Sequence, residues 1–232
     1  MTAQPSITLE TEAAGFDPVA ELDRQVRTLL DLGYPRIAGM SASAFTRRVA
    51  HLRELVAGAG ELEPPTNQRV PFVLVVTQRL APVDRTMPLT ALNGKPGFVS
   101  ADTADVHRFE AIKTVRVPGD IYLAVDVERG DEYLNWSPDE ALAKLTSRER
   151  TPLTVDEGIA LFTHFPGSLE KNRCFMLAGS RCGDRRVPAL WISSGSGKDG
   201  KPRRGAPKLG WCWAGNRHTW LGHASAGSRE GH

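Results

Sequence analysis

The sequence lacks an apolar run that approaches the roughly 18 residues needed to cross a bilayer, which argues against a transmembrane helix. Its start, MTAQPSITLETEAAG, has neither the basic end nor the apolar stretch of a secretory leader. Cysteine is also scarce. Cys174, Cys182 and Cys212 are odd in number and lack C-x-x-C spacing, so no disulfide framework is expected. These absences predict a cytoplasmic protein without a membrane segment.

The composition is that of a globular protein, but its charge is unevenly distributed. Of the 232 residues, 41% are apolar and 24% are charged, which is ordinary for a domain with a sizeable core. Residues 181–232 hold ten Lys and Arg against three Asp and Glu, a net +7, whereas residues 1–180 sum to −5. A basic end of this kind can attract phosphates, nucleic acid or an acidic partner.

The N-terminal part predicts a short tail followed by two helices. Residues 1–15 have few large apolar groups and no periodicity, which is typical of a disordered tail. The segment that follows opens on an Asp-Pro pair suited to a helix start, carries apolar residues at helical spacing and ends at Gly33. A second such pattern follows, and together they predict a helical hairpin over residues 17–60. Its apolar stripe could serve a partner as well as the core.

The middle of the chain predicts two strands separated by irregular structure. Residues 70–77 and 120–128 are short apolar runs rich in β-branched residues, as in buried strands. Four prolines and weak periodicity between them predict irregular chain, with one short helix around residues 102–109.

Two helix starts carry a capping-box pattern, SPDE at 137–140 and TVDE at 154–157. In each, the hydroxyl accepts from the amide three residues on, and the Glu side chain accepts from the amide of the first residue. Pro166 closes the second helix. His164 lies in its last turn, where the helix dipole favours a cationic ring.

The C-terminal third predicts strands around a polar loop. Strand patterns cover CFMLAGS, RVPALWIS and KLGWCWAGN, and the last two flank a Gly-, Ser- and charge-rich loop over 194–207 that we predict to be mobile. The α/β core would then span residues 70–222, within a single domain over 16–228. The prediction is an α+β fold, in which an N-terminal helical hairpin packs on a mixed, largely antiparallel sheet with two further helices.

Tryptophan is concentrated near the end of the chain, in KLGWCWAGNRHTWLG. Alternation along a strand places Leu209, Trp211 and Trp213 on one face and three small residues, Gly210, Cys212 and Ala214, on the other. The tryptophan face is interpreted as core, with a ligand platform as the alternative. The face of small residues predicts a close approach of another segment.

The loop after this strand suggests a binding site. His218 is the candidate general acid or base, because a loop histidine can titrate near neutral pH. The candidate ligand-binding residues are arginines for charge, tryptophans for an apolar wall and a turn asparagine: Arg185, Arg186, Trp213, Asn216 and Trp220. Two structural alternatives stay open. The His218 ring can cap its own turn, and Asp184 can pair with either arginine.

A metal site is not predicted. The three cysteines, His218 and His223 offer donors for tetrahedral zinc, but the spacings match no common zinc motif. The cysteines are interpreted as small buried residues, and convergence on a metal in the fold is the open alternative. No cofactor is predicted.

Four stretches together resemble a known family: GYPRIAGM, TPLTVDEGIALFTHFP, CFMLAGSRCGDRRVPALWIS and APKLGWCWAGNRHTWLGHASA. They are similar to a family of actinobacterial proteins of unknown function, over roughly residues 17–228. The resemblance implies no activity, cofactor or catalytic residue.

The functional hypothesis is binding of a small anionic or aromatic molecule beside the C-terminal sheet, with acid/base chemistry at His218. The alternative is a nucleic-acid or acidic-partner binding module that uses the basic, Trp-rich C-terminal segment.

Overall fold

The computed structural model describes residues 15–231, and the predicted tail over 1–15 lies outside this range except for Gly15. The α-helices are α1 Pro18–Asp31, α2 Tyr34–Ile37, α3 Ala42–Ala57, α4 Val83–Thr86, α5 Pro138–Ser147 and α6 Val155–His164. Short 3-10 turns cover Met87–Leu89, Ala101–Thr103, Val106–Arg108, Asp131–Tyr133, Pro166–Ser168, Gly197–Asp199 and Lys201–Arg203. The helix predicted around 102–109 is therefore two such turns. No helix among the described residues is long and apolar enough to span a membrane.

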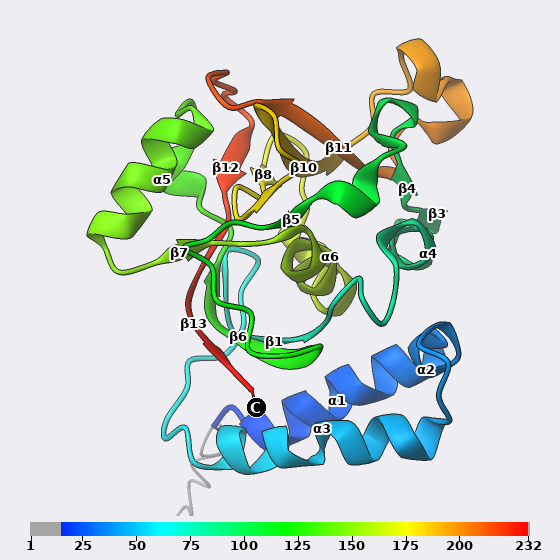
Figure 1. Ribbon diagram of the computed structural model, residues 1–232, viewed down its shortest axis with the longest axis vertical. Coiled ribbons are helices and arrows are strands. Elements are labelled where there is room, and N and C mark those ends of the chain that lie inside the picture. The colour runs from blue at the N-terminus through cyan, green and yellow to red at the C-terminus, as the bar shows by residue number, and fades with distance from the viewer. Residues whose placement is uncertain (1–14, 232) are drawn as a thin grey trace, which may run out of the picture.

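The strands form two main sheets, which confirms the predicted α+β fold (Figure 1). The first is antiparallel, in the order β1 Arg69–Val76, β6 Ile121–Glu128, β13 Ser225–Glu230 and β7 Thr151–Pro152. The second is mixed, in the order β12 Leu221–His223, β8 Cys174–Met176, β10 Arg186–Ile192, β11 Pro207–Trp213 and β4 Phe98–Val99. Two small pairs complete the set, β2 Ala91–Leu92 with β3 Lys95–Pro96 and β5 Glu110–Ala111 with β9 Ser180–Arg181.

The helical hairpin covers the outer face of the first sheet (Figure 1). The Asp17 side chain caps α1 by accepting from the amides of Val19 and Ala20, at 2.9 and 3.0 Å. Alternation in β1 points Phe72, Leu74 and Val76 at α1 and α3. The apolar stripe of the hairpin is thus used within the core of the protein, as the predicted packing on a sheet requires.

Helix α6 lies between the two sheets and organises the main core (Figure 1). Both predicted capping boxes are present, at α5 and α6. The prediction of a cationic His164 is wrong. The residue is 3% exposed and its Nε2 lies 3.0 Å from the Leu74 carbonyl oxygen, and burial lowers its pKa to about 3. The low-dielectric surroundings outweigh the helix dipole.

Strand β13 extends the core beyond the predicted limit at residue 222. Its sequence, SAGSRE, has few of the β-branched and aromatic residues that identify strands. It nevertheless lies between β6 and β7, where both neighbours supply hydrogen-bonding partners.

The tryptophan-rich strand is only partly core. Trp213 is 49% exposed, so the interpretation of its face as buried is wrong at that position. The opposite face makes the close approach that its small residues predicted. A Cβ added at Gly210 would lie 2.3 Å from the Trp191 ring.

The loop over 194–207 is tied to its surroundings by charged groups. Lys208 Nζ binds the Asp199 carboxylate at 2.9 Å, Lys198 pairs with Asp102 at 2.5 Å, and the Arg203 guanidinium lies over Phe98. Its mobility stays a prediction.

Candidate functional site

A pocket of about 590 Å³ lies at the first turn of α6, within the size range of small-molecule sites. Three parts of the chain form it: the segment after β1, the segment around β5, and the start of α6 beside β9. Its lining residues are Thr77, Gln78, Arg79, Pro82, His107, Phe109, Glu110, Ala111, Val117, Thr154, Asp156 and Ser180. We call this space the α6 pocket.

The start of α6 is held rigidly against the neighbouring segments. Thr154 and Glu157 form the capping box, and the buried Ser180 Oγ accepts from the Val155 amide at 3.1 Å. The Glu157 carboxylate also binds the Arg229 guanidinium and the Tyr122 hydroxyl, at 2.5 and 2.7 Å. The first turn of α6, which carries Asp156, is therefore held by hydrogen bonds to β9, β6 and β13.

The two walls of the pocket are joined by side-chain contacts. The Gln78 amide nitrogen donates to the Phe109 carbonyl at 2.9 Å, which ties the segment after β1 to the segment before β5. Phe109 is buried, while His107 and Glu110 beside it are exposed. The pocket thus has an apolar wall and polar groups around its opening.

Asp156 is the lining residue with the largest pKa shift. Burial raises the pKa of its carboxyl to about 7, and the neighbouring Glu157 carboxylate acts in the same direction. The Gln78 backbone amide and the Arg79 charge oppose the shift. Within residues 15–231, no Lys, Arg or His forms an ion pair with this carboxyl, since the Arg79 guanidinium binds Asp120 at 2.7 Å.

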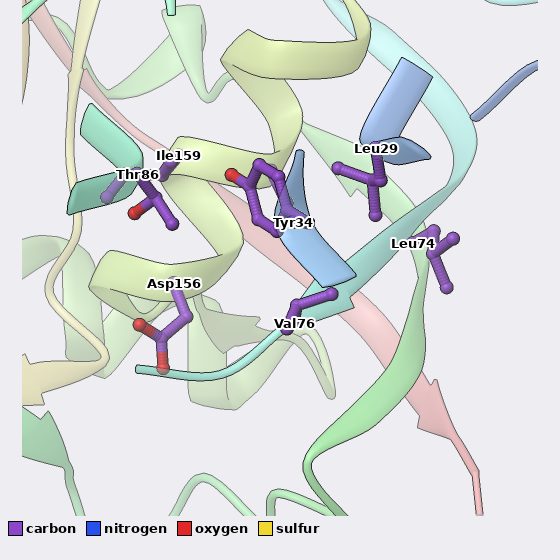
Figure 2. Close-up of a pocket in the computed structure, with 8 residues that line it drawn as sticks. Leu29, Tyr34, Leu74, Val76, Thr86, Asp156 and Ile159 are labelled. Carbon is purple, nitrogen blue, oxygen red and sulfur yellow. The ribbon is translucent and has the colours of Figure 1, made fainter. Parts of the chain in front are cut away.

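The Asp156 carboxyl also borders a small internal space. A cavity of about 10 Å³, room for about one water molecule, lies between α6 and the N-terminal helices. Figure 2 shows Asp156 at the start of α6, beside Thr86 and the Tyr34 ring. Tyr34 is buried, and burial raises the pKa of its hydroxyl to about 12. The carboxyl therefore lies between this closed cavity and the open pocket.

Arg186, predicted to bind a ligand, is occupied by two carboxylates. Its guanidinium binds Asp105 through two hydrogen bonds of 2.9 and 2.6 Å and Asp184 through one of 2.8 Å. The alternative that Asp184 pairs with a neighbouring arginine is thus confirmed. Arg186 also lies over the Phe109 ring, at 5.5 Å from its centroid. It supports the apolar wall of the α6 pocket from behind.

Arg185, Trp213 and Asn216 lie at the surface. Arg185 has a side chain that is 76% exposed and is 3.9 Å from Asp139 at the start of α5. Asn216 is exposed, and its amide donates to the Trp213 carbonyl at 3.0 Å in the turn after β11. The structure places these residues in one exposed neighbourhood, because the Arg185 guanidinium also approaches Gly215.

His218 and Trp220 lie together behind that turn. The His218 ring packs against Trp220 with 5.4 Å between centroids, and Trp220 contacts Trp191 edge-on at 6.1 Å. Burial lowers the pKa of His218, and its Nε2 is buried without a hydrogen-bond partner among residues 15–231.

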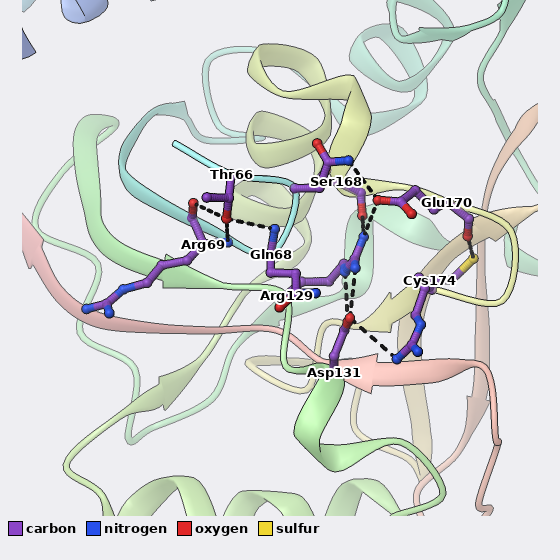
Figure 3. Close-up of polar contacts among 10 residues, drawn as sticks. Thr66, Gln68, Arg69, Arg129, Asp131, Ser168, Glu170 and Cys174 are labelled. Carbon is purple, nitrogen blue, oxygen red and sulfur yellow. Dashed lines mark hydrogen bonds and ion pairs between the residues drawn. The ribbon is translucent and has the colours of Figure 1, made fainter. Parts of the chain in front are cut away.

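A second polar cluster surrounds Arg129 at the end of β6 (Figure 3). Arg129 is 2% exposed and binds Asp131 through two hydrogen bonds of 2.7 Å. It also donates to the Ser168 carbonyl at 3.2 Å and to Glu170 at 3.1 Å. This cluster joins β6 to the segment before β8, and within residues 15–231 the Ser168 hydroxyl is its one buried side-chain group without a hydrogen-bond partner.

The cysteines do not converge on a metal. Burial raises the pKa of Cys174 and Cys212 to about 11, as expected of inert thiols. Among residues 15–231, no three His, Cys, Asp or Glu side chains come together in a way that could hold an ion.

Sequence reasoning missed Asp156, because no local signal distinguishes it from Asp139 in the equivalent SPDE pattern. The TVDE pattern accounts for Thr154 and Glu157 by the capping box and leaves the Asp between them without a role. Its burial depends on residues 77–82 and on α2, which are distant in sequence.

The fold and pocket define an α+β protein with a side pocket of small-molecule size. The chain belongs to DUF5701, a family of unknown function whose model matches residues 28–232. No curated protein and no solved structure matches the chain significantly.

Proposed function

We propose that the protein binds a small organic molecule in the α6 pocket, with Asp156 as the polar anchor and the group that exchanges a proton with it. The observation that supports this is a carboxyl without a cationic partner among residues 15–231 in a pocket of about 590 Å³. A pocket of this size with a few converging polar groups and a perturbed titratable residue is the usual form of a binding or active site.

Asp156 suits acid/base chemistry better than an ordinary aspartate. A general acid or base works best when its pKa lies near the working pH, and burial brings this carboxyl to about 7. The neighbouring Thr154 and Ser180 hydroxyls are committed to the first turn of α6. They shape the pocket and leave proton transfer to Asp156.

A fragment screen by two-dimensional NMR tests this proposal. We expect binders to perturb the amide signals of Thr154, Asp156 and Ser180, and an Ala111→Trp variant to lose them because the new ring fills the pocket. Ala111 is exposed, so the substitution should leave the fold intact; Ala143→Trp on the exposed face of α5 is the matched control. The proposal fails if binders perturb other regions only, or if both variants bind alike.

The C-terminal site is a second candidate, for an anionic or aromatic ligand with His218 as acid or base. The unpartnered His218 Nε2 favours it, with Arg185 and Trp213 exposed nearby and Arg186, Asn216 and Trp220 around them. Aromatic carboxylates that shift the His218 ring signals, and lose affinity in a His218→Ala variant, would support this site. Unchanged affinity in that variant would exclude it.

A third candidate function is nucleic-acid binding. It uses the exposed Trp213 and Arg185, but much of the basic charge of residues 181–232 is paired in the fold. Acidic partners hold Arg186, Lys198, Lys208, Arg217 and Arg229. Fluorescence polarisation with a labelled single strand at low salt tests it, and a flat titration excludes it.

A cytoplasmic location and an actinobacterial source remain proposals from the sequence. Fractionation of cells that express the native chain tests the first.

A further inference from the structure

We infer that the α6 pocket takes an organic cation, an amine or amidine whose protonated nitrogen binds the Asp156 carboxylate. This inference rests on the proposed function and names the class of ligand for the same pocket. The charges, the helix end and the apolar wall each contribute to it.

The charges that line the pocket favour a cation. Asp156 and Glu110 are acidic and, among residues 15–231, neither forms an ion pair. Arg79 is basic, but its guanidinium binds Asp120, which lies next to the strand β6. His107, exposed at the opening, is the other lining side chain that can carry positive charge. An anion would therefore meet two carboxylates.

The start of α6 offers an anion few of the usual binding groups. A helix N-terminus attracts anions through free backbone amides. Here the Val155 amide donates to Ser180 Oγ at 3.1 Å, and the Glu157 amide donates to Thr154 Oγ1 at 3.3 Å. The Asp156 carboxyl already places a negative group at this end of the helix.

The carbon part of the ligand has a matching surface. Phe109, Val117, Pro82 and Ala111 form the apolar part of the lining. Burying a carboxylate without a counter-charge is costly, and a ligand ammonium or amidinium placed against this wall would supply that charge. Neutral molecules of the same shape would gain only the apolar contact.

The pH dependence of ligand affinity distinguishes a cation that binds the carboxylate from a ligand that binds the protonated carboxyl. A cation needs the ionised carboxylate, so its affinity rises with pH through the Asp156 pKa of about 7. A ligand that accepts a hydrogen bond from the protonated carboxyl would show the reverse. Other charged or titratable groups near Asp156 come from each element around it. They are Glu157 on α6, Tyr34 on α2, Tyr122 on β6, Arg79 and Asp120 beside β1 and β6, and His107 and Glu110 across the pocket.

The test uses four probes of similar size: benzamidine, benzylamine, benzyl alcohol and benzoate. Each is titrated by NMR into the full chain, into Asp156→Asn and into Asp139→Asn, the same position in the capping box of α5. We expect the two cations to bind the wild-type chain and Asp139→Asn, and to lose at least roughly tenfold in Asp156→Asn. Between pH 5.5 and 7.5 their affinity should rise roughly 20-fold, following ionisation of one carboxyl.

Each possible result decides for or against the inference. Benzyl alcohol or benzoate binding as tightly as the cations overturns the inference, and so does cation binding that is equal in wild type and Asp156→Asn. If neutral or anionic fragments perturb the pocket while cations do not, the inference fails and the proposed function stands. If nothing of any charge perturbs the pocket, both fail.

Discussion

Replacing Asp156 by asparagine should stabilise the protein above neutral pH. The carboxyl titrates near pH 3.8 when unfolded, and burial raises its pKa to about 7 in the folded state. An acid whose pKa rises on folding makes the folded state less stable as pH increases from the lower value through the higher one. At pH 8 the shift corresponds to about 4 kcal/mol of lost stability. Because Asp156 is only half-buried in the folded chain, solvent screens part of this effect, and we expect about half of it, ~2 kcal/mol.

Urea unfolding at pH 4.5 and pH 8 measures the effect. Asn can still accept the hydrogen bond from the Gln78 amide, so Asp156→Asn should be close to wild type at the lower pH and more stable at the higher. Asp139→Asn is the control, because Asp139 holds the same helix position with a side chain that is 61% exposed. It should cost up to ~1 kcal/mol, the usual effect of a charge at a helix start. An Asp156→Asn effect that matches this control, or does not change with pH, would refute the reasoning.

Three further predictions concern stability, each measured by urea unfolding. Arg229→Met should cost about 3–5 kcal/mol, because it leaves the fully buried Glu157 carboxylate without its guanidinium; a change below 1 kcal/mol would contradict this. Gly210→Ala should cost about 1–3 kcal/mol, since the new methyl group would overlap the Trp191 ring, and an unchanged midpoint would show that the ring moves freely. Trp213→Ser should cost about 0.5–1.5 kcal/mol, because the half-exposed Trp213 packs edge-on against Trp211 with 4.7 Å between ring centroids, and an unchanged midpoint would show that this contact does not stabilise the fold.

The parts of the fold that depend on local contacts were predictable from the sequence. The two capping boxes and the Asp17 cap join residues within three positions of each other, so the pattern carries the whole interaction. Strand β13 was not predictable in this way. Its residues have weak strand preference, and its place is decided by β6 and β7, which lie far away in sequence.

Among the predicted site residues, too, local contacts were predictable and contacts with distant segments were not. Alternation correctly placed Gly210 opposite the tryptophans, but it could not tell which end of the strand is covered, and Trp213 is exposed. The pairing of Asp184 with Arg186 was foreseeable as a contact within one turn, whereas the second partner of Arg186, Asp105, was not.

The sequence by itself determined where α5 and α6 begin, because a hydroxyl and a glutamate three residues apart satisfy the first amides of a helix wherever that helix lies. SPDE and TVDE are equivalent at this level, and each places an aspartate at the second helical position. Only the tertiary structure made the two aspartates different. Asp139 faces solvent, whereas α2, the segment after β1 and the segment around β5 enclose Asp156 and raise its pKa. Burial by distant segments, which no local pattern records, turns one of two like residues into the candidate functional group.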